Sequence, residues 1–165
     1  MSDKVIIADC DYFRTHQEEL EAKVKAGSRL VIFMDKPLNV IGDDVIFLTH
    51  EDDTECGSKN LVYRSETYPF TKEFDEYDFK NFYNAELDFQ EVTARYRFNW
   101  DGSEEILYVY DSPNPSDRFH KLHINVVAKK NYGGGEVILT TLHTVNGCIG
   151  HNPVLDKFIV NLIEK

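Results

Sequence analysis

Apolar runs alternate with polar, turn-forming segments along this chain, and the pattern is most regular near the N-terminus. Residues 4–9 (KVIIAD) and 29–34 (RLVIFM) are short apolar runs typical of buried strands. Between them, Asp11 can cap a helix through its carboxylate, and Gly27 suits the left-handed residue that ends one. The order predicts a βαβ unit with parallel strands and a right-handed crossover.

The middle of the chain is less regular. Residues 45–48 and 60–64 read as strands separated by a polar, turn-like stretch. Residues 66–89 hold many aromatic side chains among acids and show no sustained period. We interpret them as an irregular, packed loop with one helical turn at most.

The C-terminal half is rich in strand patterns and closes with a helix. Strands are predicted at 92–98, 105–111, 121–129 and 136–144, with a turn at 100–103 and a loop at 112–117. In the helix, Asn152 is the expected N-cap and Pro153 the first residue. Its wide apolar stripe must lie on a sheet or on another domain.

The expected sheet has few helices to cover it. Parallel sheets are normally buried on both faces, and the sequence predicts only two helices. Two alternatives follow: extra strands fill the gap, or something outside this chain covers a thinly protected face. The second alternative favours a domain cut from a larger protein.

Composition narrows the classes of partner. The 165 residues fit one domain, 1–165, with 42% hydrophobic residues and a net charge of -11 from 29 acids and 18 bases. Nucleic acids and anionic membranes are disfavoured, because both are bound through clustered Lys and Arg. A neutral sugar or a protein partner is compatible with this charge. The three dispersed cysteines, Cys10, Cys56 and Cys148, favour the reducing cytoplasm over a disulfide framework.

Nucleophile and metal chemistry are weakly supported. Cys10 follows a strand but lies between two aspartates, whose negative charge raises a thiol pKa. His120 and His123 are three apart, which places them on opposite faces of a strand. His143 and His151 flank one loop, so a site there stays open as an alternative. We expect no catalytic residue, no metal ligand and no cofactor.

Other chemistry-like patterns favour structural interpretations. The acidic pairs Asp43–Asp44, Asp52–Asp53 and Glu104–Glu105 are adjacent in sequence, whereas glycosidase carboxylates face each other across a cleft. Three consecutive glycines at 133–135 precede a strand rather than a helix, which favours a tight turn over a phosphate loop.

The aromatic region 66–100 is the strongest candidate for ligand binding. Trp100, Tyr83 and Phe82 could stack on sugar rings, although aromatic side chains also fill cores and domain interfaces. We favour the core for most of them and keep carbohydrate binding as the alternative.

Three segments resemble parts of known proteins. Residues 4–33, ending in AGSRLVIF, resemble the strand–helix–Gly–strand of class I glutamine amidotransferase-like domains attached to some glycosidases. Residues 65–88, through Asp78-Phe79 and Phe82-Tyr83, resemble a C-terminal segment of glycoside hydrolase family 2-like proteins. Residues 133–165 resemble the closing strand and helix of the same proteins. Together the segments span about half the chain.

The resemblance implies a fold and a role. The implied fold is α/β, a glutamine amidotransferase-like (flavodoxin-like) three-layer sandwich with a partly parallel, mixed sheet and flanking helices, complete or incomplete. In that family the sugar-cleaving carboxylates lie in a separate barrel, which takes ~250 residues. The amidotransferase cysteine has no counterpart after Met34.

We therefore expect a non-catalytic accessory domain of a β-galactosidase- or β-glucuronidase-type protein. Its expected partners are other domains of the parent glycosidase or like subunits, with carbohydrate as the alternative. A small enzyme that uses Cys10 or the His143/His151 pair is the third hypothesis.

Overall fold

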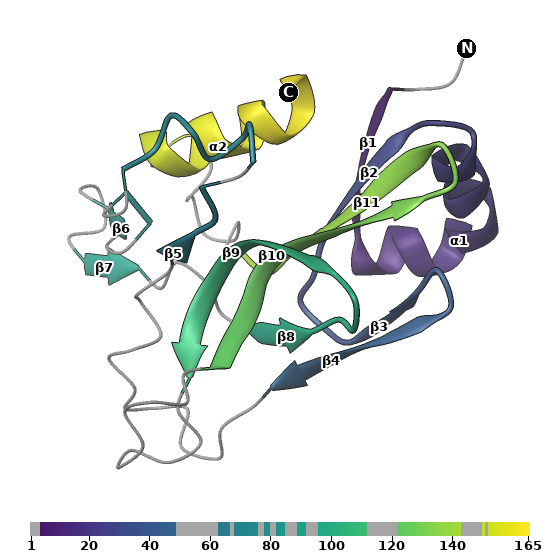
Figure 1. Cartoon of the computed structure of the whole chain (residues 1–165), viewed down its shortest axis with the longest axis horizontal. Helices are drawn as coiled ribbons and strands as arrows, with labels where there is room; N and C mark the ends of the chain where they lie inside the picture. Colours follow the sequence, from purple (N-terminus) through teal and green to yellow (C-terminus); the bar gives the residue numbers. More distant parts are fainter. Residues whose placement is uncertain are drawn as a thin grey trace.

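The computed structural model describes residues 4–48, 63–66, 68–75, 78–79, 82–84, 89–91, 96–111, 122–142, 150 and 152–165. Within them the chain is mixed α/β, with a curled, partly parallel sheet and two helices (Figure 1). The strands are β1 (Val5–Asp9), β2 (Arg29–Phe33), β3 (Leu38–Val40), β4 (Asp43–Leu48), β5 (Tyr63–Arg64), β6 (Phe82–Asn84), β7 (Phe89–Glu91), β8 (Arg97–Asn99), β9 (Glu104–Asp111), β10 (Leu122–Tyr132) and β11 (Gly135–Thr140). The helices are α1 (Cys10–Lys25) and α2 (Pro153–Glu164).

The βαβ prediction is confirmed, with one correction at the helix start. β1 and β2 pair in parallel, and α1 connects them. The N-cap is Asp9, whose carboxylate accepts from the Tyr12 N–H at 2.7 Å, so the expectation of Asp11 as the cap was wrong. Asp11 lies in the first helical turn and pairs with Lys36 at 2.6 Å. Gly27, with a φ of 113°, follows the C-cap residue Ala26, where a left-handed residue is favoured.

The sheet gains its third parallel strand from the far end of the sequence. β11 lies beside β2 in parallel, with Glu136 opposite Arg29, and β10 pairs with β11 antiparallel. Beyond them, β10 also pairs with β9 and β8, and the order continues through β4 to β3. Register shifts between Asn125 and Ala128 interrupt the β9–β10 ladder, and such irregularities increase strand twist.

Most strand predictions agree with the structure where it describes them. The predicted strands 105–111, 121–129 and 136–144 correspond to β9, β10 and β11, and 45–48 falls within β4. The turn at 100–103 is confirmed by a hydrogen bond from the Ser103 N–H to the Trp100 carbonyl. Only the ends of the predicted strands 60–64 and 92–98 are described, as β5 and the start of β8, and the loop 112–117 lies outside the described residues.

Both faces of β2 and β11 are covered by this chain itself. Alternate residues of β2 enter opposite cores: Leu30 and Ile32 pack under α1, whereas Val31 packs under α2. β11 repeats the arrangement, with Val137 and Leu139 on one side and Ile138 on the other. A thinly covered sheet face, one of the two alternatives drawn from the sequence, is therefore not found over β2 and β11.

The aromatic segment contributes to the core on the α2 side. Phe70, Phe74 and Phe79 are buried, and the Phe74 and Phe79 rings pack on Phe158 of α2 at centroid distances of 6.0 and 5.4 Å. Asn161 of α2, also buried, donates from Nδ2 to the Phe70 carbonyl at 3.1 Å. The described part of 66–79 is thus an irregular, packed loop as predicted, whereas the β6–β7 hairpin was not predicted.

Candidate functional site

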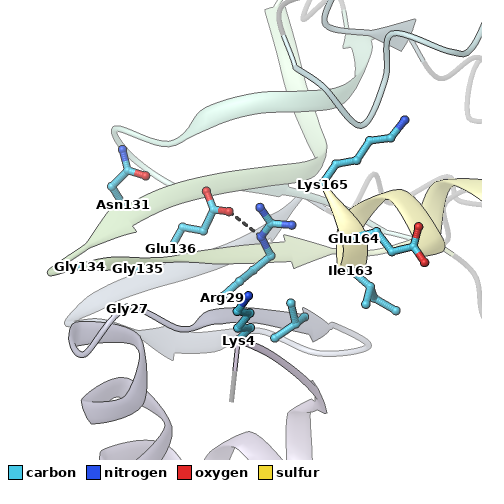
Figure 2. Close-up of a pocket in the computed structure, with 11 residues that line it drawn as sticks. Lys4, Gly27, Arg29, Asn131, Gly134, Gly135, Glu136, Ile163, Glu164 and Lys165 are labelled. Carbon is cyan, nitrogen blue, oxygen red and sulfur yellow. Dashed lines mark hydrogen bonds and ion pairs between the residues drawn. The ribbon is translucent and has the colours of Figure 1, made fainter. Parts of the chain in front are cut away.

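A pocket of about 470 Å³ opens where the three parallel strands begin (Figure 2). Lys4 and Arg29 stand at the starts of β1 and β2, and Glu136 stands near the start of β11. The β10–β11 turn closes one side, and Ile163 and Lys165 approach from the end of α2.

An ion cluster forms the floor of this pocket. The Arg29 Nε lies 2.6 Å from one carboxylate oxygen of Glu136, and the Lys129 Nζ lies 3.1 Å from the other. Arg29 also donates from Nη1 to the Leu162 carbonyl of α2 at 2.7 Å. The cluster therefore joins β2, β10, β11 and α2, with each of its three charged side chains only 15–17% exposed.

Burial and charge act against each other on Glu136. Burial raises the pKa of its carboxyl, but the hydrogen bonds from Lys129 and Arg29 outweigh burial and hold the pKa below its ordinary value of 4.5. Aromatic rings flank both cations: Phe70 lies 5.3 Å from the Arg29 guanidinium, and Tyr68 lies 5.4 Å from the Lys129 Nζ. The Tyr68 hydroxyl donates to Glu104, and burial raises the pKa of this hydroxyl.

The position and chemistry of the cluster favour a structural role. Ligands of open α/β sheets bind outside the carboxyl ends of the strands, whereas this pocket lies at their amino ends. A carboxylate with a lowered pKa is a poor proton acceptor near neutral pH. Glu136 forms ion pairs with both Arg29 and Lys129, and Arg29 also binds α2. We therefore interpret the cluster as a structural link between the sheet and α2.

Cys10, the first residue of α1, lies at the carboxyl end of β1, opposite the end that borders the pocket. Its side chain is 1% exposed, and its Sγ lies 3.7 Å from the Phe33 carbonyl oxygen and 3.8 Å from that of Lys36. Burial raises the pKa of the thiol, which suppresses the nucleophilic thiolate. Cys10 is thus held as an inert core residue.

The described carboxylate pairs each bind separate neighbours rather than one another across a cleft. Asp43 pairs with Lys130 at 2.7 Å, and Asp44 accepts from the Asn39 amide at 2.8 Å. In the Glu104–Glu105 pair, Glu104 accepts from the Tyr68 hydroxyl. Asp52 and Asp53 lie outside the described residues.

Only part of the histidine prediction can be placed. Glu105, the other member of the 104–105 pair, lies 2.8 Å from the His123 Nδ1, and the His123 ring stacks on Tyr108 at 4.2 Å. His120, His143 and His151 lie outside the described residues. Among the residues that the structure does describe, no group of three or more His, Cys, Asp and Glu side chains is arranged to hold a metal ion.

The aromatic candidates for sugar binding lie in two parts of the fold, Trp100 after β8 and Phe82 and Tyr83 in β6. Trp100 is 2% exposed and packs in the α1-side core, with the Lys130 Nζ 4.9 Å from its ring centroid. Its ring offers no open face for a sugar in this structure. Phe82 and Tyr83 belong to β6, where they pair with Glu91 and Gln90 of β7.

Exposed aliphatic side chains lie on α2 and on β1, the strand at one end of the described sheet. On α2, Asn161 faces the aromatic segment, and the 100° step per residue places Ile163 and Val160 on the other side of the helix. Ile163 lines the same pocket as Lys4 and Val5 at the start of β1. Ile163 and Val160 are 38% and 45% exposed. Ile7 is 49% exposed and lies two residues after Val5, which packs in the α2-side core, so it faces the same side. We call Ile7, Val160 and Ile163 the apolar rim.

The sequence contained only half of the signal for this rim. The apolar stripe of α2 is wider than one core contact requires, which indicated a second contact surface. The run of residues 4–9, however, is typical of a fully buried strand, and periodicity does not reveal that β1 lies at one end of the described sheet.

Comparisons with protein-family models, curated proteins and solved structures found no match for this chain. In the part of the chain that the structure describes, neither helix has the length and apolarity required to cross a membrane.

Proposed function

We propose that this chain is a non-catalytic interaction domain, the C-terminal accessory domain of a glycoside hydrolase family 2-like protein. It works by packing on other domains of that protein or on like subunits. The observation that carries the proposal is the apolar rim: Ile7 of β1 and Val160 and Ile163 of α2 are exposed aliphatic side chains, and Ile163 lines the same pocket as Lys4 and Val5 at the start of β1. Exposed large apolar groups that gather on one surface are typical of interaction sites.

The placement of the chemically capable residues supports the same proposal. Cys10 is buried, and burial raises the pKa of its thiol. Glu136 is held in ion pairs with Arg29 and Lys129. Each of these groups contributes to packing or to the joining of elements. The parent type rests on the resemblance of residues 4–33, 65–88 and 133–165 to glycosidase-associated domains.

The first test uses the complete protein encoded by the reading frame that contains this chain. Ile163→Lys is compared with Ile46→Lys, because Ile46 is 59% exposed on β4, near the opposite edge of the sheet. In the isolated chain, both changes replace an exposed side chain and should alter the melting temperature little. In the complete protein, Ile163→Lys should cost about 2 kcal/mol or more, because a buried Ile contributes about 1.5–3 kcal/mol, whereas Ile46→Lys should stay neutral.

Two results would contradict this proposal. One is an equal effect of the two substitutions in the complete protein. The other is a reading frame without a glycosidase segment, which would remove the parent assignment. Saturable heat on titrating the isolated chain with oligosaccharides would instead favour carbohydrate binding. Trp100→Ala is unsuitable as the binding-deficient control, since removing a buried ring would destabilise the core.

A further inference from the structure

Among the described strands, β1 has a partner on one edge only, and its outer edge presents a regular set of backbone groups. β1 is the last strand of the described sheet, with β2 as its neighbour. The Arg29 N–H donates to the Lys4 carbonyl at 2.9 Å, so Lys4 points toward β2. Successive residues of a strand direct their backbone groups to alternate edges. The N–H and C=O groups of Val5 and Ile7 therefore point outward, away from β2.

The features that usually protect an edge strand are few on β1. Natural edges are blunted by central charges, prolines, bulges or a covering element. The centre of β1 is Ile6, Ile7 and Ala8, and its parallel register with β2 is continuous over five residues. The exposed side chain of Ile7 belongs to this same edge strand and faces the α2 side of the sheet.

From this edge we infer that β1 pairs antiparallel with β1 of a second copy of the chain, and that the two sheets form one continuous sheet across a two-fold axis. This inference rests on the proposed interaction role and names the partner. A two-fold axis perpendicular to the sheet places the α2-side faces of both copies on the same side of the joined sheet. Because side chains alternate between faces along a strand, odd-numbered residues must then oppose odd-numbered residues. Full overlap of Val5–Asp9 with its own copy places Ile7 opposite Ile7 of the second copy.

Charge favours the antiparallel direction and the identical partner. Lys4 immediately precedes β1, and the strand ends at the carboxylate residue Asp9. Antiparallel self-pairing places Lys4 of each copy beside the acidic end of the other, whereas parallel pairing would place like charges together. The arrangement also brings the two Ile7 side chains together on the α2 side of the joined sheet.

The test separates backbone pairing from general apolar association. The wild-type chain should sediment as a dimer of about 38 kDa, twice its 19.1 kDa, at concentrations above the dissociation constant. Ile7→Pro removes an outward N–H that the chain's own sheet does not use, and edge strands tolerate proline at such positions. Ile7→Pro and Ile7→Lys should weaken association at least tenfold, and Ile46→Lys should not.

Hydrogen exchange keeps the inference testable without any variant. In the wild-type chain, the outward amides of Val5 and Ile7 should exchange at least tenfold more slowly at high than at low protein concentration. The amides of Ile6 and Ala8, directed toward β2, should be protected at both concentrations. A monomer at all concentrations, or a dimer unaffected by Ile7→Pro and without this protection, would overturn the inference. Neither outcome would affect the proposal that the chain packs on other domains of a parent protein, which the comparison of Ile163→Lys with Ile46→Lys tests separately.

Discussion

Replacing Glu136 with glutamine should destabilise the fold, because the change leaves two buried cations without their shared anion. Removing one partner of a fully buried ion pair costs about 3–5 kcal/mol. The side chains of Glu136, Arg29 and Lys129 retain 15–17% exposure, so solvent screening reduces the expected cost to about 2 kcal/mol. For a chain of this size, that cost lowers the melting temperature by about 4–8 °C.

The effect should depend on pH in a direction fixed by the lowered pKa of Glu136. A depressed carboxyl pKa stabilises the folded state above the unfolded value of 4.5, and this stabilisation is lost as pH falls through the folded pKa. The difference between wild type and Glu136→Gln should therefore be full at pH 7 and shrink below pH 4.5. Protonated glutamic acid and glutamine are then close in charge and shape.

Urea denaturation at pH 7 and at pH 3.5, followed by circular dichroism, measures both quantities. Glu19→Gln is the matched control, since Glu19 forms an exposed i,i+4 pair with Lys23 at 2.9 Å, and such pairs contribute little. Equal stability of Glu136→Gln and wild type at pH 7 would refute the stabilising role of the Glu136 ion pairs. So would a loss of the same size at both pH values, because a pH-independent effect is not electrostatic.

Three further predictions concern packing. In a thermal melt, Gly135→Ala should destabilise the fold by about 3 kcal/mol or more, because an added Cβ would overlap the Ser28 carbonyl oxygen and lie 2.5 Å from the Val24 carbonyl oxygen. Gly134→Ala should cost much less, because the nearest atom to its added Cβ is 3.3 Å away. Asn161→Leu should cost about 1–3 kcal/mol in urea denaturation by leaving the Phe70 carbonyl unpaired, and an unchanged midpoint would refute that role. Cys10 should react with iodoacetamide at pH 7 at least tenfold more slowly than in the unfolded chain, as read by peptide mass mapping; labelling at the unfolded rate would contradict its burial.

Local signals predicted the two ends of the chain well. The run 4–9, the periodic helix and the run 29–34 predicted β1, α1 and β2, and Asn152-Pro153 predicted the start of α2. The N-cap was misplaced because Asp9 and Asp11 are equally good capping residues. The choice between them depends on where β1 leaves the sheet, which pattern alone does not give.

Non-local contacts could not be predicted from the sequence. β11 lies beside β2, although Arg29 and Glu136 are 107 residues apart, and a period of two specifies a strand but not its neighbour. The ion cluster follows from that neighbour relation, so it was not foreseen. Trp100 illustrates the same limit: the sequence left open whether its ring stacks on a sugar or fills the core, and long-range packing buries it.

The most direct test of an interaction role is the solvent accessibility of the apolar rim in the complete protein. Hydroxyl-radical footprinting, read by mass spectrometry, compares the oxidation of Ile7, Val160 and Ile163 with that of Ile46. We predict that rim oxidation falls severalfold relative to the isolated chain at low concentration, while Ile46 reacts equally in both. Rim residues that oxidise at the same rate in the complete protein and in the isolated chain would contradict the account.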